Sequence, residues 1–166
     1  MLDALPLFPL HTVLFPGGQL PLRIFEARYM DMAKACLKDG SPFGVCLIRE
    51  GREVGEPALP AAVGTLARIE RWDMPQLGLL EIVALGGERF RLLERRIEKN
   101  GLARARVELL APDSDDEAPG SLGYCARLVE RVPLPLGVQQ ELLELDDATA
   151  RLERIKALLE GNAGAS

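Results

Sequence analysis

The stretch of sequence that decides the fold is LPLFPLHTVLFPGGQLPLRIFEARY, residues 5–29. Its first half is apolar but interrupted by prolines. Because proline lacks the N–H group that a sheet needs, this half predicts a short strand followed by extended chain. Gly17-Gly18 predicts a turn. Over residues 19–25 apolar side chains alternate with others, which predicts a strand, and Pro21 places that strand at the edge of a sheet.

A helix is predicted directly after this strand, over residues 26–38. Apolar residues recur at helical spacing along one side of the segment, so this side faces a core. Glu26 suits the positive end of the helix dipole, Lys38 suits the negative end, and Gly40 ends the helix. The apolar run FGVCLI, residues 43–48, then has the length and composition of a buried strand.

The segment 63–110 holds the remaining β signals. Residues 63–72 alternate with one slip of phase, which predicts a β-bulge. A turn at Met74-Pro75-Gln76 is predicted to return the chain as a strand over 77–85, and Gly86-Gly87 predicts a further bend. Strands over 89–97 and 102–110 are predicted around Asn100-Gly101, the strongest hairpin signal in the chain. About six short strands separated by turns predict a closed or nearly closed barrel.

The last third of the chain changes character. Residues 111–120 are rich in acidic residues and proline, which predicts a solvated linker. Beyond it the periodicity is that of three amphipathic helices, the last capped by Asp146 or Asp147 and ended by Gly161. We therefore predict an α+β protein: a mainly β barrel with one inserted helix over residues 1–112, an acidic linker over 113–120 and a C-terminal helical bundle over 121–166.

Composition narrows the class of protein. The 166 residues are 48% hydrophobic and 27% charged, as expected for one globular domain with its own core. A net charge of −5 disfavours a generic nucleic-acid binder.

Cys36, Cys46 and Cys125 are predicted to be buried thiols in a reducing compartment. The start lacks a basic leader, and no apolar run approaches the ~20 residues of a membrane span, so we expect a cytoplasmic protein.

The motifs of common catalytic sites are missing from the sequence. It contains no Gly-Lys pair, hence no phosphate loop of the Walker type, and neither a GxGxxG nor a GxSxG motif. His11 is the single histidine, and the cysteines lack the spacing of a metal site. Nothing singles out a pair of carboxylates for acid–base chemistry. We expect no catalytic residue, no cofactor and no metal, and hence a protein that is not an enzyme.

Four blocks of sequence resemble the N-terminal substrate-recognition domain of Lon proteases. The first is the segment quoted above, with LPLFPL, VLFPG, LPLRIFE and RY in this order and spacing. The others are FGV (43–45), VGTLARIE (63–70) and GGERFR (86–91). The resemblance is strong from Leu5 to about Leu110 and loose over the helical tail. It implies a β pseudo-barrel of the PUA-like type with a helix after the RY pair, followed by a helical bundle.

The same resemblance implies a role in binding. It suggests a non-catalytic module that holds unfolded or tagged polypeptides and acts with a protease or chaperone partner. Lon proteases continue into an AAA+ ATPase and a Ser-Lys peptidase, whereas this sequence ends at Ser166. The chain therefore resembles the stand-alone members, and neither ATP hydrolysis nor proteolysis is carried over. The client, the partner and the oligomeric state stay open.

Trp72, Met74 and Leu77 are the candidate peptide contacts. They cluster at the predicted turn, where the sequence departs from the polar turn more common in the family. Apolar residues on a loop could form an exposed binding patch. The alternative is that they fold back over the barrel or the helices.

RNA binding is the alternative function, because PUA-like barrels include RNA binders. The predicted strands near residue 100 carry a basic set opposed by only three glutamates, Glu88, Glu94 and Glu98. The basic set is Arg89, Arg91, Arg95, Arg96, Lys99, Arg104 and Arg106. It either forms a basic face for RNA or pairs with the glutamates at the surface, and we favour the pairing.

Overall fold

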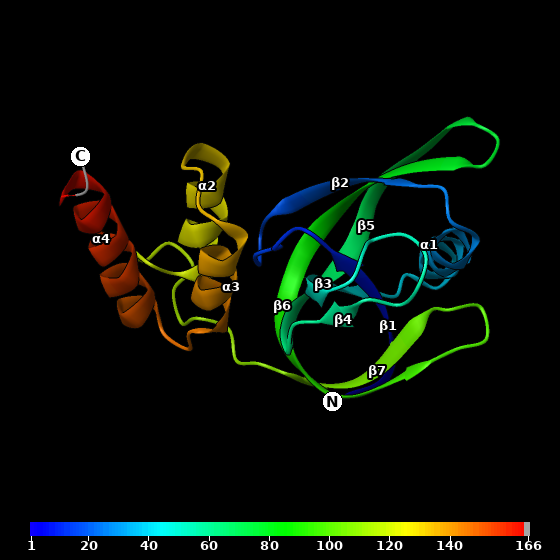
Figure 1. The fold of residues 1–166 in the computed structure, drawn as a ribbon, viewed down its shortest axis with the longest axis horizontal. Helices are drawn as coiled ribbons and strands as arrows, with labels where there is room; N and C mark the ends of the chain where they lie inside the picture. Colours follow the sequence, from blue (N-terminus) through cyan, green and yellow to red (C-terminus); the bar gives the residue numbers. More distant parts are fainter. Residues whose placement is uncertain (165–166) are drawn as a thin grey trace.

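Five strands close into a barrel in the computed structural model, which describes residues 1–164 and the side chains of residues 1–161. The order around the barrel is β1, β7, β6, β5 and β3, and a parallel pairing returns β3 to β1 (Figure 1). β2 flanks β6, and β4 flanks β3. The strands are β1 Leu2–Leu10, β2 Gln19–Ile24, β3 Phe43–Glu50, β4 Leu59–Pro60, β5 Val63–Gln76, β6 Leu79–Ile97 and β7 Ala103–Leu109. The predicted mainly β barrel is confirmed, with seven strands in place of about six.

The longest strand, β6, corrects the predicted bend at Gly86-Gly87. Residues 79–97 form one continuous strand. The Gly86 N–H donates to the Gly18 carbonyl at 2.8 Å, and the Gly86 carbonyl accepts from the Gly17 N–H at 2.9 Å. A Cβ atom on Gly86 would lie 2.3 Å from the Phe15 carbonyl oxygen. The glycine therefore lets the 15–18 turn lie directly against the strand, and it does not end the strand.

The β5–β6 hairpin confirms the predicted bulge and corrects the predicted turn. The pairing register slips between Ile69 and Arg71, as the change of phase in the sequence predicted. The turn itself is wrong by about two residues, because β5 continues to Gln76. The chain reverses at Leu77 and Gly78, where Gly78 has φ of 85°. Only glycine adopts that backbone conformation without strain, so Gly78 fixes the position of the turn.

Helix α1 closes one end of the barrel. It spans Ala27–Asp39, begins after Glu26 and ends at Gly40, which has φ of 67°. Tyr29, Met30 and Ala33 are buried in the same core cluster as the inner residues of β2 and β6. The predicted helix is confirmed, and so is the edge position of β2, which pairs only with β6.

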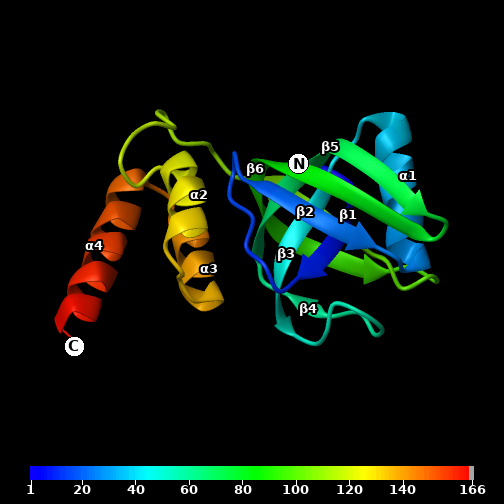
Figure 2. The same cartoon turned by 90° about the horizontal axis from the view of Figure 1, so that it is seen from above.

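The C-terminal helices pack at the opposite end of the barrel from α1 (Figure 2). They are α2 Leu122–Arg131, α3 Leu136–Glu144 and α4 Ala148–Gly164. Barrel residues Val13, Phe15 and Val63 share one apolar cluster with buried residues of all three helices. One detail differs from the prediction: α4 continues past Gly161. The boundaries at residues 112 and 120 stay a prediction.

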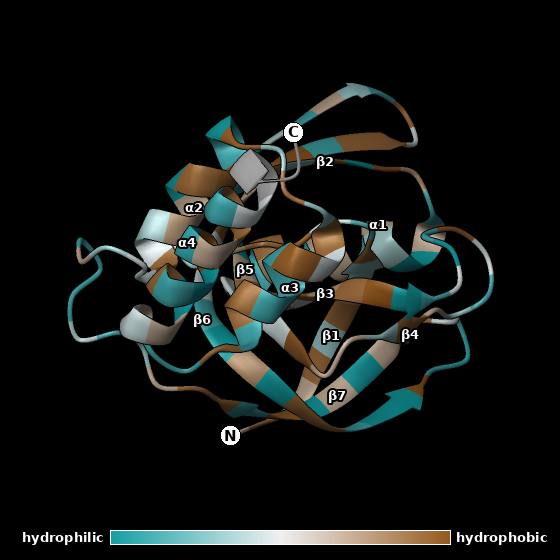
Figure 3. Ribbon diagram, turned by 60° about the vertical axis from the view of Figure 1, so that its left-hand side comes forward, coloured by the Kyte–Doolittle hydropathy of each residue, from teal (hydrophilic) through white to brown (hydrophobic). Residues whose placement is uncertain are grey.

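Side chains along the strands point alternately into the core and toward the surface. In β7, Ala103, Ala105 and Val107 are buried, while Arg104 and Arg106 face outward. Hydrophobic and hydrophilic colours alternate along β6 and β7 in Figure 3. The Asn100-Gly101 turn joins these strands as predicted, with the Asn100 side chain accepting from the Leu102 N–H at 2.9 Å.

All three cysteines are buried free thiols, and we expect them to be unreactive in the folded protein. Burial raises the pKa of the Cys46 thiol to about 12 and that of Cys125 to about 11. Because the thiolate is the nucleophile, titration with a chromogenic disulfide at pH 8 is expected to label no thiol until denaturant is added, and then three. Rapid labelling of a native thiol would contradict this packing.

Candidate functional site

A shallow groove crosses the three strands β2, β6 and β5, near the end of the barrel that α1 closes. Residues opposite one another in paired strands share a face of the sheet. One row of opposite residues across the three strands is Pro21, Val83 and Arg71. Two residues further along β2, a second row is formed by Arg23, Glu81 and Asp73. Arg23 and Glu81 are 3.7 Å apart, so this face carries paired charges. With Leu22, Trp72 and Ile82, these residues line a volume of about 840 Å³, which we call the Trp72 groove.

The structure separates the three predicted contact residues. Trp72 is 58% exposed and lines the Trp72 groove. Leu77 is 97% exposed at the tip of the hairpin, which projects beyond the barrel in Figure 1. Met74 is partly buried and packs against the core cluster under α1. Met74 therefore supports the hairpin, whereas the other two residues face outward.

A smaller pocket adjoins the groove at the start of α1. It has a volume of about 170 Å³ and shares Pro21, Leu22 and Arg23 with the Trp72 groove. We call it the Tyr29 pocket. Its other lining residues are Phe8, Leu10, Ile24, Phe25, Glu26, Tyr29, Glu53 and Val54. Phe25 and Val54 are 64% and 49% exposed, so an apolar rim continues from the groove to this pocket.

Charged groups surround the buried Tyr29 ring. The ring stacks on Phe8, with centroids 4.1 Å apart, and the Arg28 guanidinium lies 4.7 Å from its centroid. Burial raises the pKa of the Tyr29 phenol; Arg28 lowers it, and Glu26 and Glu53 raise it further. Arg28 is itself 6% exposed and donates to Glu26 at 2.8 Å and to the Gly101 carbonyl at 3.0 Å. The RY pair of the opening motif thus joins α1 to the β6–β7 turn.

The basic strands do not form the uniform basic face considered for RNA. Including Arg89 in that face was wrong: the side chain is 3% exposed and donates to the carbonyls of Leu143, Leu145 and Ala111. Arg104 pairs with Glu98, and Arg106 pairs with Glu94 at 3.3 Å. The pairing with glutamates that the sequence favoured is confirmed for these two arginines.

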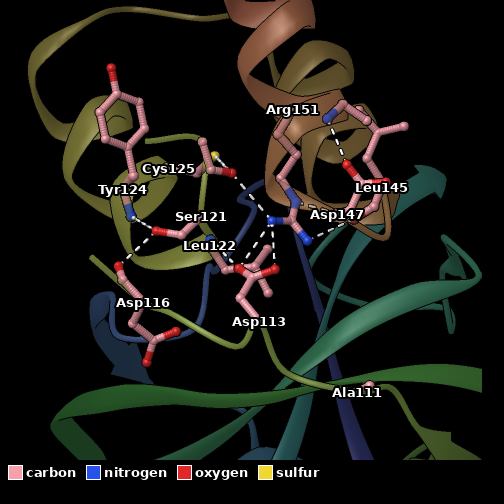
Figure 4. Close-up of polar contacts among 12 residues, drawn as sticks. Ala111, Asp113, Asp116, Ser121, Leu122, Tyr124, Cys125, Leu145, Asp147 and Arg151 are labelled. Carbon is pink, nitrogen blue, oxygen red and sulfur yellow. Dashed lines mark hydrogen bonds and ion pairs between the residues drawn. The ribbon is translucent and has the colours of Figure 1, made fainter. Parts of the chain in front are cut away.

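Sequence reasoning missed a buried polar cluster that joins α4 to the segment between β7 and α2. Arg151 of α4 is fully buried, and its Nη1 lies 3.0 Å from both oxygens of Asp113 (Figure 4). It also donates to the Leu145 carbonyl at 2.9 and 3.1 Å and to the Gly120 carbonyl at 3.2 Å. For Asp113 the predicted solvated linker is wrong, because this carboxylate is 7% exposed. A charged residue in a helical pattern usually signals a solvent face, so no local pattern predicts this pair.

Within the described residues no group of three or more His, Cys, Asp or Glu side chains is placed to hold a metal ion. His11 lies exposed, and its backbone N–H donates to Glu53 at 2.8 Å.

None of the helices described has the length and apolarity needed to cross a bilayer. Phe25 and Val54, which extend the apolar rim, were also missed. Phe25 falls on the outward side of the 19–25 alternation, whereas Val54 belongs to no periodic pattern.

Comparison with known proteins shows that this chain is similar to Lon proteases and to cereblon. Residues 4–132 match the ATP-dependent protease La (LON) substrate-binding domain. A Lon protease from Anaeromyxobacter dehalogenans is 31% identical over 191 aligned positions that include 93% of this chain. Protein cereblon from Gallus gallus is 28% identical over 112 positions, 65% of this chain. The chain spans about a quarter of the length of these curated relatives, 23% and 24% respectively.

Solved structures agree with the observed fold. The crystal structure of a Lon N-terminal domain protein from Xanthomonas campestris is 40% identical, with a TM-score of 0.81 over 94% of this chain and 98% of that one. The N-terminal domain of a Mycobacterium avium complex Lon protease shares the fold at 16% identity, with a TM-score of 0.66, covering 91% of this chain and 95% of that one. By the domain match and these likenesses, the chain belongs to the Lon substrate-binding domain family.

Proposed function

We propose that this chain binds extended segments of unfolded or tagged polypeptides along the Trp72 groove, without catalysing a reaction on them. The observation that carries the proposal is the Trp72 ring, 58% exposed beside a groove of about 840 Å³. Large aromatic rings at the surface are enriched at the centres of binding interfaces, because they bury much apolar area with few rotatable bonds. Membership of a substrate-binding family supports polypeptide as the ligand.

The edge strand β2 favours recognition through side chains. β2 pairs only with β6 among the strands described, so its other edge is open to an extended ligand. Pro21 stands in the middle of this strand and supplies no N–H, which disfavours the addition of a full ligand strand. A ligand would therefore lie along the residues that line the Trp72 groove, with the exposed Trp72 ring as its main apolar contact, and Leu77 would extend this surface at the hairpin tip.

The partner in this proposal is a protein. The bound polypeptide is a client that the chain holds for a protease or chaperone, and membership of the Lon substrate-binding domain family supports this role. We place the protein in the cytoplasm, where its three free thiols stay reduced. The ion pairs of Arg104 and Arg106 on β7 favour this function over RNA binding, because the charge of these two arginines is already balanced at the surface.

Trp72 is the sole tryptophan, so its fluorescence reports directly on the groove. We expect a chemically unfolded, carboxymethylated model protein to shift the emission to shorter wavelength as the ring loses water. Trp72→Ala is expected to weaken binding about 10-fold or more, measured by anisotropy of a labelled peptide. Stability should change little, because the side chain is mostly exposed.

Leu93→Ala is the matched control for this experiment. Leu93 is 39% exposed on β6 but lies outside the lining of the groove, so its removal is expected to leave affinity within about twofold. Equal affinity of the wild-type and Trp72→Ala proteins for unfolded polypeptide would place binding elsewhere and refute the role of the groove.

A further inference from the structure

We propose that the Tyr29 pocket receives the side chain of a lysine or arginine of the bound polypeptide, so that the protein prefers extended segments in which a basic residue accompanies apolar ones. This inference rests on the proposed function and adds a chemical preference to it. Three observations support it: the size of the pocket, the balance of charge within it, and the hydroxyl group of Tyr29, which lines it.

The size of the Tyr29 pocket suits one long side chain. Its volume of about 170 Å³ lies below the roughly 300–1,000 Å³ of pockets that hold whole small molecules. Leu10, Leu22 and Ile24 give it apolar walls, which suit the methylene stem of a lysine or arginine. The exposed ring of Phe25 lies at the rim, where an aromatic face attracts a cation.

The charges that line the pocket sum to a single negative charge. The Glu26 carboxylate is neutralised by Arg28 at 2.8 Å, and its other oxygen accepts from the Gly55 N–H at 3.3 Å. Arg23 pairs with Glu81 at 3.7 Å. Glu53 has no basic side chain within ion-pair distance among the described residues, and only its Oε2 accepts a hydrogen bond, from the His11 N–H. One carboxylate oxygen of Glu53 is thus free to accept from a cation.

Tyr29 supplies the second polar group. The residue is 6% exposed, and within the described part of the chain no side chain or backbone group hydrogen-bonds to its hydroxyl. Glu26 and Glu53 line the same pocket as Tyr29, and both carboxylates raise the pKa of its phenol. The hydroxyl oxygen is not among the fully buried polar atoms that lack a partner, so it meets solvent at the pocket and is open to a hydrogen bond from a ligand N–H donor.

The Tyr29 pocket is continuous with the Trp72 groove, so one extended ligand can occupy both. The two share Pro21, Leu22 and Arg23 on the open edge strand. In an extended chain, alternate side chains point the same way and lie about 7 Å apart. One basic side chain can therefore enter the Tyr29 pocket while its apolar neighbours cover Trp72.

A pair of N-acetylated peptides tests the preference. One carries a single lysine among leucine and serine residues, and the other carries norleucine at that position, which keeps the stem and removes the charge. We expect the lysine peptide to bind the intact chain about fivefold more tightly, as measured by Trp72 fluorescence and peptide anisotropy. Acetylation removes the terminal amine as a competing cation.

Two conservative variants locate the preference. Glu53→Gln keeps the acceptor for His11 but loses the charge, and Tyr29→Phe removes only the hydroxyl oxygen. Each is expected to weaken the lysine peptide about threefold to fivefold and to leave the norleucine peptide unchanged. Glu56→Gln, which removes a charge from the same loop outside the pocket, is the control and should leave both affinities unchanged. Melting temperatures of all variants report whether they fold.

The outcomes separate this inference from the proposed function. If neither peptide binds, polypeptide binding itself is refuted. If both peptides bind equally well, or if Glu53→Gln and Tyr29→Phe weaken both peptides alike, the pocket does not select a basic side chain, and the groove stands alone. Selective loss of the lysine peptide in both variants supports the proposal.

Discussion

Arg151→Met is expected to lower the free energy of unfolding by about 3–5 kcal/mol, the cost of breaking a buried ion pair from one side. Arg151 is fully buried and donates to Asp113, Gly120 and Leu145. Methionine fills much of the space but donates no hydrogen bond. The Asp113 carboxylate, 7% exposed, would then be buried without its counter-ion, and two carbonyl groups would lose a donor.

Urea denaturation followed by far-ultraviolet circular dichroism measures this effect. Arg154→Met is the matched control, because Arg154 pairs with Glu141 at 2.9 Å but is 37% exposed, and its loss should cost at most about 1 kcal/mol. Replacing both Arg151 and Asp113 with apolar residues is expected to recover part of the stability lost in the single variant, since no charge is left buried. Equal stability of Arg151→Met and Arg154→Met would contradict the role of the cluster.

The position of this cluster also predicts what Arg151→Met leaves intact. The helices lie at the opposite end of the barrel from α1, near which the Trp72 groove is found (Figure 2). Below its melting temperature the variant is therefore expected to bind polypeptide with unchanged affinity. Loosened helices should show as faster proteolysis within residues 113–120, because that segment is held by Asp113 and by the Gly120 carbonyl.

Gly64→Ala is expected to destabilise the barrel by about 3 kcal/mol, at the upper end of the usual cost of overpacking. A Cβ atom at this position would lie 2.4 Å from the Val45 carbonyl oxygen, 2.7 Å from Cζ of Phe90 and 2.8 Å from Sγ of Cys46. Val45, Cys46 and Phe90 are all buried, so neither the ring nor the backbone has room to move. The glycine in the VGTLARIE block is thus required by close packing between β5 and β3.

Gly161→Ala is the control for the glycine experiment. Among the described residues, no atom outside its own helix backbone lies within 4 Å of the position that its Cβ would take, and alanine favours a helix over glycine by up to about 1 kcal/mol. Thermal unfolding should therefore show a lower melting temperature for Gly64→Ala and an equal or higher one for Gly161→Ala. A Gly64→Ala protein as stable as the wild type would show that β3 and β5 can separate without cost.

Much of the candidate site follows from the sequence, but the exposure of its residues does not. Trp72, Met74 and Leu77 were predicted together because they are adjacent in the chain. The actual turn at Leu77 and Gly78 extends β5, which turns Met74 toward the core and leaves Trp72 at the groove. The Tyr29 pocket brings together Phe8, Phe25 and Glu53 from three separate segments, and no local pattern relates them.

Local periodicity and turn chemistry determined the elements of this protein. The alternation in residues 19–25, the glycine at 40, the phase slip before Arg71 and the Asn100-Gly101 turn each act through neighbours in the chain, so the sequence alone predicts them. The tertiary structure decided what depends on distant partners. Closure of the barrel needs Leu7 opposite Gly44, and burial of Arg151 needs Asp113, 38 residues away. A buried charge is stable only when folding delivers its partner, and no periodic pattern records that meeting.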